Sequence, residues 1–254
     1  MKLTLLLLLC FSLTSLSCTS QPQVSRIEIV QPSIQQEATS IWRTINDYSF
    51  FEQQGYTINL PKAPVIDSLI VKSRNGTFGN DDFPVIYALL EDGLFNPEDY
   101  TKATQSVADR MKLLNDLVGT INAEKDAWDW KFNMFDTYKI VFTLYGSGGS
   151  YDPDQGLVTL LTNNEGWFMK YENPAYSIIH EITHMGMEYS IVRKYKLSHG
   201  TKERMVDTFV FLMFNEQLPE YRIQDMGDKN IDQQLSTQQD LQRLDAIAST
   251  FKNK

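Results

Sequence analysis

The segment His180-Glu181-Ile182-Thr183-His184 carries the residue types that could do chemistry. Residues four apart project from one face of an α-helix, so His180 and His184 can present two imidazole nitrogens to one metal ion, with Glu181 beside it. The chain contains only three histidines, and this segment holds two of them. The spacing predicts a Zn²⁺ site in which Glu181 acts as the general base of a hydrolytic reaction.

A catalytic zinc ion needs a third protein ligand and one open position. The stretch from Leu197 to Thr201 is typical of a turn that ends with Thr201 as a helix cap, and the helix expected after it carries Glu203 and Asp207 four residues apart. We expect Glu203 to bind the metal. Asp207, one turn later, would accept the outer N–H of a zinc-binding histidine and fix its tautomer.

The two segments together resemble the gluzincin metallopeptidases, the thermolysin-like group. The matching residues are His180-Glu181-Ile182-Thr183-His184 and, nineteen residues after His184, Glu203-Arg204-Met205-Val206-Asp207; the match covers about residues 174–215. The resemblance implies a zincin-like fold, His180, His184 and Glu203 as zinc ligands, Glu181 as general base and Asp207 as an outer partner. It also implies that the run Gly156 to Thr162 is the edge strand that binds substrate, through Gly156, Leu157, Val158, Thr159 and Leu160.

One part of the family pattern is missing. Thermolysin-like enzymes use a histidine downstream of the third ligand to stabilise the oxyanion, and this chain has no histidine after His199. Two other side chains could donate to the oxyanion. Tyr195 lies eleven residues after His184, where the family often has a tyrosine, and His199 lies close to Glu203 in sequence.

Two alternative interpretations remain open at this point. His199 could replace Glu203 as the third ligand, which would give a zinc hydrolase of another lineage. The chain could also be a non-catalytic surface lipoprotein that binds peptides or glycans through aromatic side chains, for which core packing is the plainer explanation. These side chains are Trp128, Trp130, Phe132 and Phe135.

The sequence around the histidines predicts how they are held. Asn173-Pro174 supplies a cap and a first-turn proline for the metal helix, and apolar residues from Ile178 to Tyr189 predict that the helix is buried. Gly186 would allow close contact with another element. Upstream, Tyr138 to Tyr145 and Gly156 to Thr162 are rich in β-forming residues and predict a hairpin or two adjacent strands, joined through a flexible glycine-rich segment.

The rest of the chain alternates strand and helix signals, which favours an α+β fold with a small mixed or antiparallel sheet and a mainly helical remainder. The remaining expected elements are a strand at Arg26–Val30, a helix from Ile34 capped by Ser33, a strand at Val65–Val71, a loop at Arg74–Asp82, a helix starting at Asn96–Asp99 with one apolar stripe from Val107 to Val118, and a terminal helix at Ser236–Phe251.

The first residues predict export. Lys2 followed by the apolar run Leu3–Phe11 is typical of a signal peptide spanning residues 1–17, and the small residues before Cys18 resemble a bacterial lipoprotein cleavage site. We therefore expect a secreted or cell-envelope protein, anchored through a lipid on Cys18. The only other cysteine is Cys10, so the mature domain has no internal disulfide and no thiolate ligand.

Charge and length limit the partners and the domain count. The net charge of −9 becomes one unit more negative when Lys2 is removed, which disfavours nucleic acid and anionic membrane surfaces. The expected partner is a peptide or protein substrate, with membrane contact only through the lipid. Residues 18–25 predict a tether, and residues 26–254 one domain with an N-terminal scaffold (26–136), a catalytic core (137–215) and a helical C-terminal part (216–254).

Overall fold

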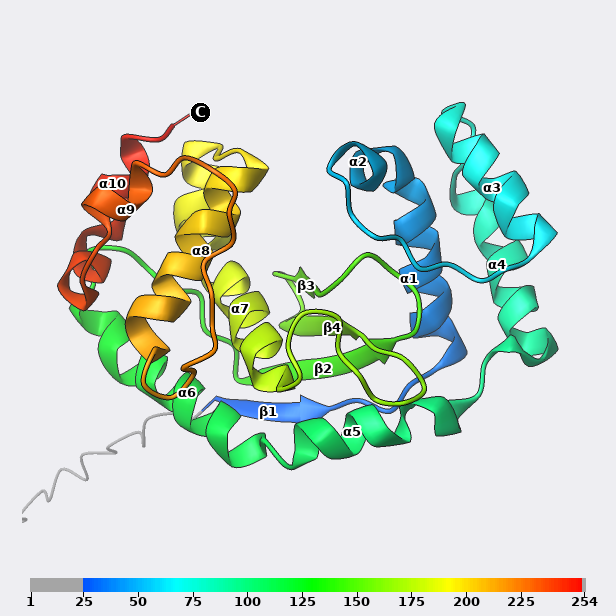
Figure 1. The fold of residues 1–254 in the computed structure, drawn as a ribbon, viewed down its shortest axis with the longest axis horizontal. Coiled ribbons are helices and arrows are strands. Elements are labelled where there is room, and N and C mark those ends of the chain that lie inside the picture. Colours follow the sequence, from blue (N-terminus) through cyan, green and yellow to red (C-terminus); the bar gives the residue numbers. More distant parts are fainter. Residues whose placement is uncertain (1–24, 253–254) are drawn as a thin grey trace, which may run out of the picture.

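The computed structural model describes residues 25–252 and has a small sheet at its centre. The sheet contains four strands in the order β1-β2-β4-β3 (Figure 1). The neighbours β1–β2 and β2–β4 are parallel, and β3 is antiparallel to β4. The α+β class with a small mixed sheet is therefore confirmed. The strands are β1 (Arg26–Ile29), β2 (Thr137–Thr143), β3 (Ser150–Asp152) and β4 (Leu157–Leu161).

The two β-rich runs upstream of the metal helix are adjacent strands, as predicted. They are β2 and β4, and Val141 faces Thr159 in their parallel register. Because parallel neighbours cannot be joined by a tight hairpin, the connection leaves the sheet and returns through β3. The prediction that the Gly156 to Thr162 run forms the edge strand is wrong: β4 pairs with β2 on one side and β3 on the other, so the edge belongs to β3.

Helices surround this sheet, and Figure 1 shows α1 to α4 on one side of β3 and α8 to α10 on the other. The central helix α7 packs against β3 and β4, and against α6 and α8. The helices are α1 (Ile34–Asn46), α2 (Tyr48–Gln53), α3 (Pro64–Arg74), α4 (Phe83–Leu89), α5 (Thr101–Ala108), α6 (Met111–Glu124), α7 (Pro174–Met187), α8 (His199–Phe214), α9 (Ile231–Gln234) and α10 (Leu244–Ser249). Short 3-10 or π turns lie at Asn80–Asp82, Leu90–Leu94, Pro97–Tyr100, Lys125–Ala127, Glu188–Arg193 and Gln238–Arg243.

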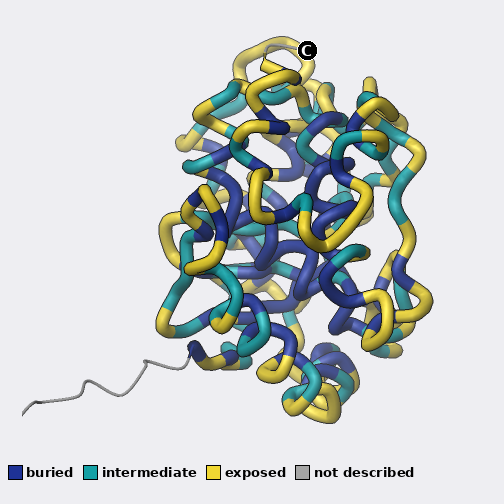
Figure 2. The backbone as a smooth tube through the Cα atoms, turned by 90° about the vertical axis from the view of Figure 1, so that its left-hand side faces the viewer, coloured by how far each residue is buried: buried dark blue, intermediate teal, exposed yellow. Residues whose placement is uncertain are grey.

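Two apolar cores hold these elements together, and Figure 2 shows the buried segments running through the middle of the molecule. The main core extends from Ile27 through α7 and α8 to Phe251, so all three predicted parts of the chain contribute to it. A smaller core joins α1, α3 and α4 through Ile41, Ile66 and Ile86. Among residues 25–252 no helix is both long and apolar enough to cross a bilayer.

The helix caps at Ser33, Asn96 and Asn173 and the strand at the N-terminus are confirmed. The predicted strand at 65–71 is wrong, because this stretch forms the helix α3. Its β-branched residues suggested a strand, but Ile66 and Leu69 are buried at helical spacing, and Pro64 starts the first turn.

Two predicted helices are interrupted. The apolar stripe from Val107 to Val118 is divided between α5 and α6, which are separated at Asp109 and Arg110. The predicted terminal helix at 236–251 is a 3-10 turn followed by the short α10. Its start is set by Asp240, whose carboxylate accepts hydrogen bonds from the backbone N–H groups of Ser236 and Thr237.

The aromatic cluster lies in the core. Trp128, Trp130 and Phe132 are buried, and the two indoles stack with centroids 5.1 Å apart. The indole N–H of Trp130 donates to the carbonyl of Leu241 at 2.8 Å, which ties the cluster to the C-terminal part. These side chains therefore do not form the exposed aromatic surface that the peptide-binding or glycan-binding alternative requires.

Two glycines in helix interiors make a matched test of the packing around α7. A methyl group at Gly119 in α6 would meet no atom within 4 Å, whereas one at Gly186 in α7 would lie 2.0 Å from the ring of Phe132. Gly119→Ala should stabilise the fold by roughly 0.5–1 kcal/mol, because alanine loses less entropy in a helix. Gly186→Ala should destabilise it by roughly 1–3 kcal/mol through overpacking. Chemical denaturation of both variants measures the difference, and equal effects would contradict the close contact.

Candidate metal centre

The helix α7 holds both motif histidines in the interior. The side chain of Asn173 accepts a hydrogen bond from the N–H of Ala175, and Pro174 forms the first turn, as the sequence predicts. His180, Glu181 and His184 are all buried. Because packing surrounds the helix, the side chains cannot rearrange freely, and the two imidazoles face the start of α8.

The third residue at this point is Glu203 on α8. The Nε2 atoms of His180 and His184 are 3.0 Å apart, and Glu203 Oε2 lies 3.4 Å and 3.3 Å from them. Ligand atoms about 2.0–2.1 Å from one tetrahedral zinc ion would lie roughly 3.3 Å from one another. The three side chains therefore fit a metal ion. Within residues 25–252 they form the only cluster of three His, Cys, Asp or Glu side chains able to hold one.

The start of α8 differs from the prediction in one detail. The helix begins at His199, and its cap is Ser198, whose hydroxyl accepts a hydrogen bond from the N–H of Thr201. The expected cap, Thr201, is instead a buried residue of the first turn. The shift does not change the spacing within the helix, so Glu203 and Asp207 still share one face.

Asp207 lies where the sequence placed it, behind His180. Its Oδ1 is 3.0 Å from His180 Nδ1, and its Oδ2 accepts a hydrogen bond from the N–H of Gln224 at 2.8 Å. The sequence did not point to Tyr221, whose hydroxyl lies 2.7 Å from His180 Nδ1 and donates to Asp207 Oδ1 at 2.7 Å. Tyr221 lies after α8 in a stretch with no motif, so only the folded chain brings it here.

Burial and mutual charge shift the pKa values of the site. Burial alone would lower the pKa of His180, but its hydrogen bonds to Asp207 and Glu203 raise the pKa to about 9. Burial lowers the pKa of His184 to about 4. Burial alone would raise the pKa of Glu203, but the neighbouring imidazoles hold it far below its usual range. The site thus keeps a carboxylate charged in the interior, beside two nitrogen donors.

Glu181 lies beside the ligands without joining their triangle. Burial raises the pKa of its carboxyl group to about 7, which is suited to a group that must both take up and release a proton near neutrality. A Cβ atom on Gly149 would lie 2.4 Å from Glu181 Oε1. The glycine-rich connection therefore passes directly over the carboxylate, and a larger residue at position 149 would displace it.

The centre opens into a cleft of about 750 Å³. Its walls come from both sides of the molecule in Figure 1: Arg43 and Phe50 from α1 and α2, and His199 and Lys202 from α8. The edge strand β3 contributes Ser150 and Tyr151 to the lining. The cleft therefore borders the three candidate ligands, the sheet edge and the N-terminal helices.

The structure brings only part of the predicted substrate strand to this cleft. Thr159 and Leu160 line it, whereas Gly156, Leu157 and Val158 do not. Val158 is fully buried, and the residues Leu157 to Thr159 have strand partners on both sides. The sheet edge on this side is therefore β3 and not this run, because strand pairing cannot be read from composition.

The two oxyanion candidates have different positions. Tyr195 does not line the cleft; it packs against the main core, with the Lys194 ammonium 5.0 Å from its ring centroid. His199 does line it, and its Nε2 lies 2.7 Å from the hydroxyl of Tyr56. His199 Nδ1 is 3.7 Å from Glu203 Oε1 and is outside the ligand triangle, so the geometry favours Glu203 as the third ligand.

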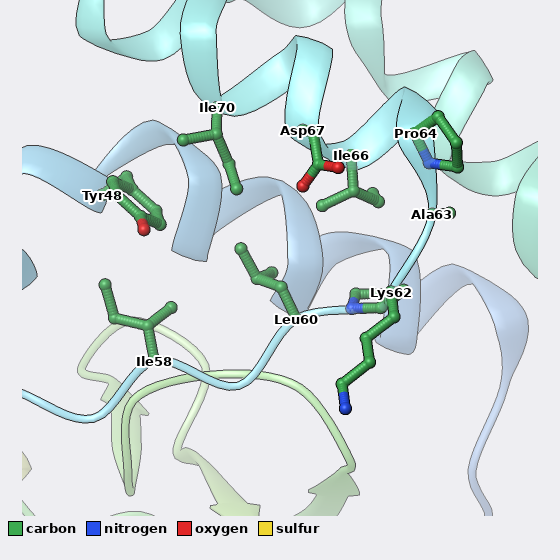
Figure 3. A pocket seen from close by; sticks show the side chains of 10 residues that line it. Tyr48, Ile58, Leu60, Lys62, Ala63, Pro64, Ile66, Asp67 and Ile70 are labelled. Carbon is green, nitrogen blue, oxygen red and sulfur yellow. The ribbon is translucent and has the colours of Figure 1, made fainter.

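A second pocket, of about 450 Å³, lies between α3 and the loop before it (Figure 3). Its lining is mostly apolar, with Leu60, Ile66 and Ile70 pointing inward, and Lys62 and Asp67 are its charged residues. Its lining contains no histidine and only one carboxylate, Asp67.

No protein-family model matches this chain, and searches of curated proteins and of solved structures likewise give no match.

The ligand set can be tested by metal content. His180→Ala, His184→Ala and Glu203→Ala should each lose the bound metal, because two remaining ligands bind much more weakly than three. His199→Ala should retain it and is the matched control for loss of a nearby imidazole. Elemental analysis of the purified residues 19–254 after incubation with zinc measures the content. Retention in Glu203→Ala with loss in His199→Ala would make His199 the third ligand.

Proposed function

We propose that this chain is a zinc-dependent peptidase that hydrolyses peptide bonds with Glu181 as general base. The observation that carries the proposal is the buried triangle of His180, His184 and Glu203, whose ligand spacing suits a tetrahedral ion. Imidazole and carboxylate donors without thiolates are a common set at catalytic zinc sites. His180, His184 and Glu203 would supply three ligands to a zinc ion, and a catalytic zinc site also needs a position for water or substrate.

The zinc ion and the side chains would have different roles in the reaction. When bound, a zinc ion would supply Lewis-acid chemistry that polarises a carbonyl group and activates water. Glu181 would accept the proton of the attacking water and deliver it to the leaving amine. Its burial under Gly149 keeps the carboxylate directed at the cleft. Asp207 and Tyr221 would fix the tautomer of His180, so that Nε2 remains available as a ligand.

A peptide suits the shape of the cleft better than a small molecule does. The cleft is long enough to extend from α2 to the sheet edge, and β3 pairs with β4 on one side only. An extended peptide could therefore add to β3 through backbone hydrogen bonds, while side-chain pockets select the sequence. The oxyanion would be stabilised by His199, which Tyr56 orients from the opposite wall.

We propose that the protein works outside the cytoplasm, secreted or attached to the cell envelope through a lipid on Cys18. The residues that support this, the signal peptide 1–17 and Cys18, lie outside the described residues. The first described residue, Ser25, directly precedes β1. The expected partner is a peptide or protein substrate, with no nucleic acid.

The general-base role can be tested by a charge-neutral substitution. Glu181→Gln should reduce hydrolysis of a denatured protein such as casein by at least about a hundredfold, since general-base catalysis contributes roughly 10²–10⁴. Zinc content should stay at the wild-type value because Glu181 is not a ligand. Glu216→Gln, the same change at an exposed position, is the control and should be fully active. Full activity in Glu181→Gln would exclude this role.

The glycine above Glu181 gives a second test. Gly149→Ala should displace the Glu181 carboxylate, because the added methyl group would lie 2.4 Å from Oε1. We expect hydrolysis to fall by about tenfold or more, as displacement of a catalytic group by about 1 Å can cost roughly a hundredfold, while zinc content is unchanged. Gly119→Ala serves as the control. Wild-type kcat in Gly149→Ala would contradict the contact between the glycine loop and the base.

A further inference from the structure

We propose that Tyr151 is a positioning residue that fixes the imidazole of His184 by stacking on it, while Glu188 and Arg193 hold the tyrosine in place. The inference depends on the metal centre and not on the peptidase activity. It concerns how the second histidine of the motif is oriented, for which neither the spacing of the motif nor the resemblance of the two segments gives an answer.

The two histidines of the centre are held in different ways. His180 Nδ1 has two polar partners, Asp207 at 3.0 Å and the hydroxyl of Tyr221 at 2.7 Å. His184 Nδ1 is buried and has no hydrogen-bond partner within residues 25–252. Metal-binding histidines usually donate their second N–H to a carboxylate, carbonyl or water, which fixes the ring. For His184, the described side chains supply no such bond, so another contact must fix its orientation.

The contact on His184 is an aromatic ring from the edge strand. The ring of Tyr151 lies nearly parallel to the imidazole, at an interplanar angle of 6° and a centroid distance of 4.9 Å. This is the offset-stacked arrangement that aromatic pairs favour. Because stacking covers one face of the imidazole, it resists rotation of the ring about its bond to Cβ, which would move Nε2 out of the ligand triangle.

Tyr151 is itself held at both ends. Its backbone is part of β3, opposite Val158 in the register with β4. Its hydroxyl donates to Glu188 Oε2 at 2.9 Å, and Glu188 Oε1 accepts from Arg193 Nε at 2.7 Å. Glu188 is buried and follows α7 directly, one turn beyond His184. The carboxylate of Glu188 therefore holds the tyrosine and does not belong to the ligand triangle.

The arrangement also joins the metal centre to the cleft wall. Tyr151 lines the cleft on the strand that has a free edge. The ammonium of Lys202, the neighbour of the ligand Glu203, lies 5.5 Å from the centroid of the same ring and 3.3 Å from Glu203 Oε1. One side chain therefore contacts a ligand on α7 and the immediate neighbour of a ligand on α8. A displacement of β3 would be transmitted to His184 through this ring.

Three variants distinguish the effect of the Tyr151 ring on metal binding from the effect of its hydroxyl group and from that of a general loss of stability. Tyr151→Val removes the ring and retains a residue suited to a strand. Tyr151→Phe retains the ring but loses the bond to Glu188 and the weaker one from Lys202 Nζ at 3.5 Å. Tyr195→Val is the matched control, since it removes a half-buried tyrosine outside the cleft. Zn²⁺ affinity would be measured by competition with a chelator. The visible absorption spectrum of the Co²⁺-loaded protein reports ligand geometry, and thermal unfolding of the metal-free protein reports stability alone.

We expect Tyr151→Val to bind Zn²⁺ about 10–100-fold more weakly, the usual effect of losing an outer partner of a metal ligand, with shifted Co²⁺ bands. Tyr151→Phe should restore most of the affinity, and Tyr195→Val should match wild type whatever its stability. Wild-type affinity and spectrum in Tyr151→Val would overturn the proposal.

If Tyr151→Val does not fold, Tyr151→Phe decides the question. Because its ring is released from Glu188, this variant should bind Zn²⁺ a few-fold more weakly and show altered Co²⁺ bands. An unchanged affinity and spectrum would overturn the proposal that Glu188 holds the tyrosine in place. A peptidase assay is not required, so loss of the proposed function alone would leave this result intact. Failure of the wild-type chain to bind either metal would overturn the metal centre, and this inference with it.

Discussion

The burial of a charged carboxylate between two imidazoles is the constraint on which the rest of the structure depends. Glu203 is removed from water at the contact of α7 with α8, and an unpaired charge there would cost several kcal/mol. It is tolerated because His180 and His184 face its Oε2 and the Lys202 ammonium lies 3.3 Å from its Oε1, and a cation in the triangle would offset the cost further. The two helices must therefore keep a fixed separation. Arg204, next to Glu203, joins α8 to the segment that follows it by binding Asp232 and the carbonyls of Gln224 and Met226.

The N-terminal helices form the opposite wall of the cleft, and a second buried carboxylate joins them to the sheet. Glu37 on α1 accepts hydrogen bonds from the hydroxyl of Tyr100 at 2.7 Å and from the N–H of Leu144 at 2.9 Å, just beyond β2. Burial raises the pKa of this carboxyl group. The helices α1, α3 and α4 share a small core that is separate from the main one. The hydrogen bonds of Glu37 therefore help to set the position of these helices, and of the cleft wall they form, relative to the metal centre. The Tyr56–His199 pair makes a second link across the cleft.

The centre combines two ways of orienting a histidine. His180 Nδ1 is held by directional polar contacts with Asp207 on α8 and Tyr221 in the segment after α8. Such contacts fix both the tautomer and the plane of the ring. His184 is held by a ring from the sheet edge, which fixes the plane but leaves Nδ1 without a partner in the described chain. The second histidine is therefore the one whose geometry follows the position of β3, the strand that also borders the cleft.

The sequence by itself predicted that the two histidines share one helix face with Glu181 beside them, and that Asp207 follows Glu203 by one turn of the next helix. The pairs His180–His184 and Glu203–Asp207 are each four residues apart within a helix, a spacing that the backbone geometry converts directly into a shared face. The caps at Ser33, Asn96 and Asn173 are local for the same reason. That Glu203 meets the two histidines depends on the packing of α7 against α8. Only the tertiary structure decided which strand forms the sheet edge, that residues 65–71 are helical, and that Tyr56, Tyr151 and Tyr221 meet the histidines while Tyr195 does not. These outcomes depend on pairing and packing between segments far apart in the chain, and no local spacing encodes them.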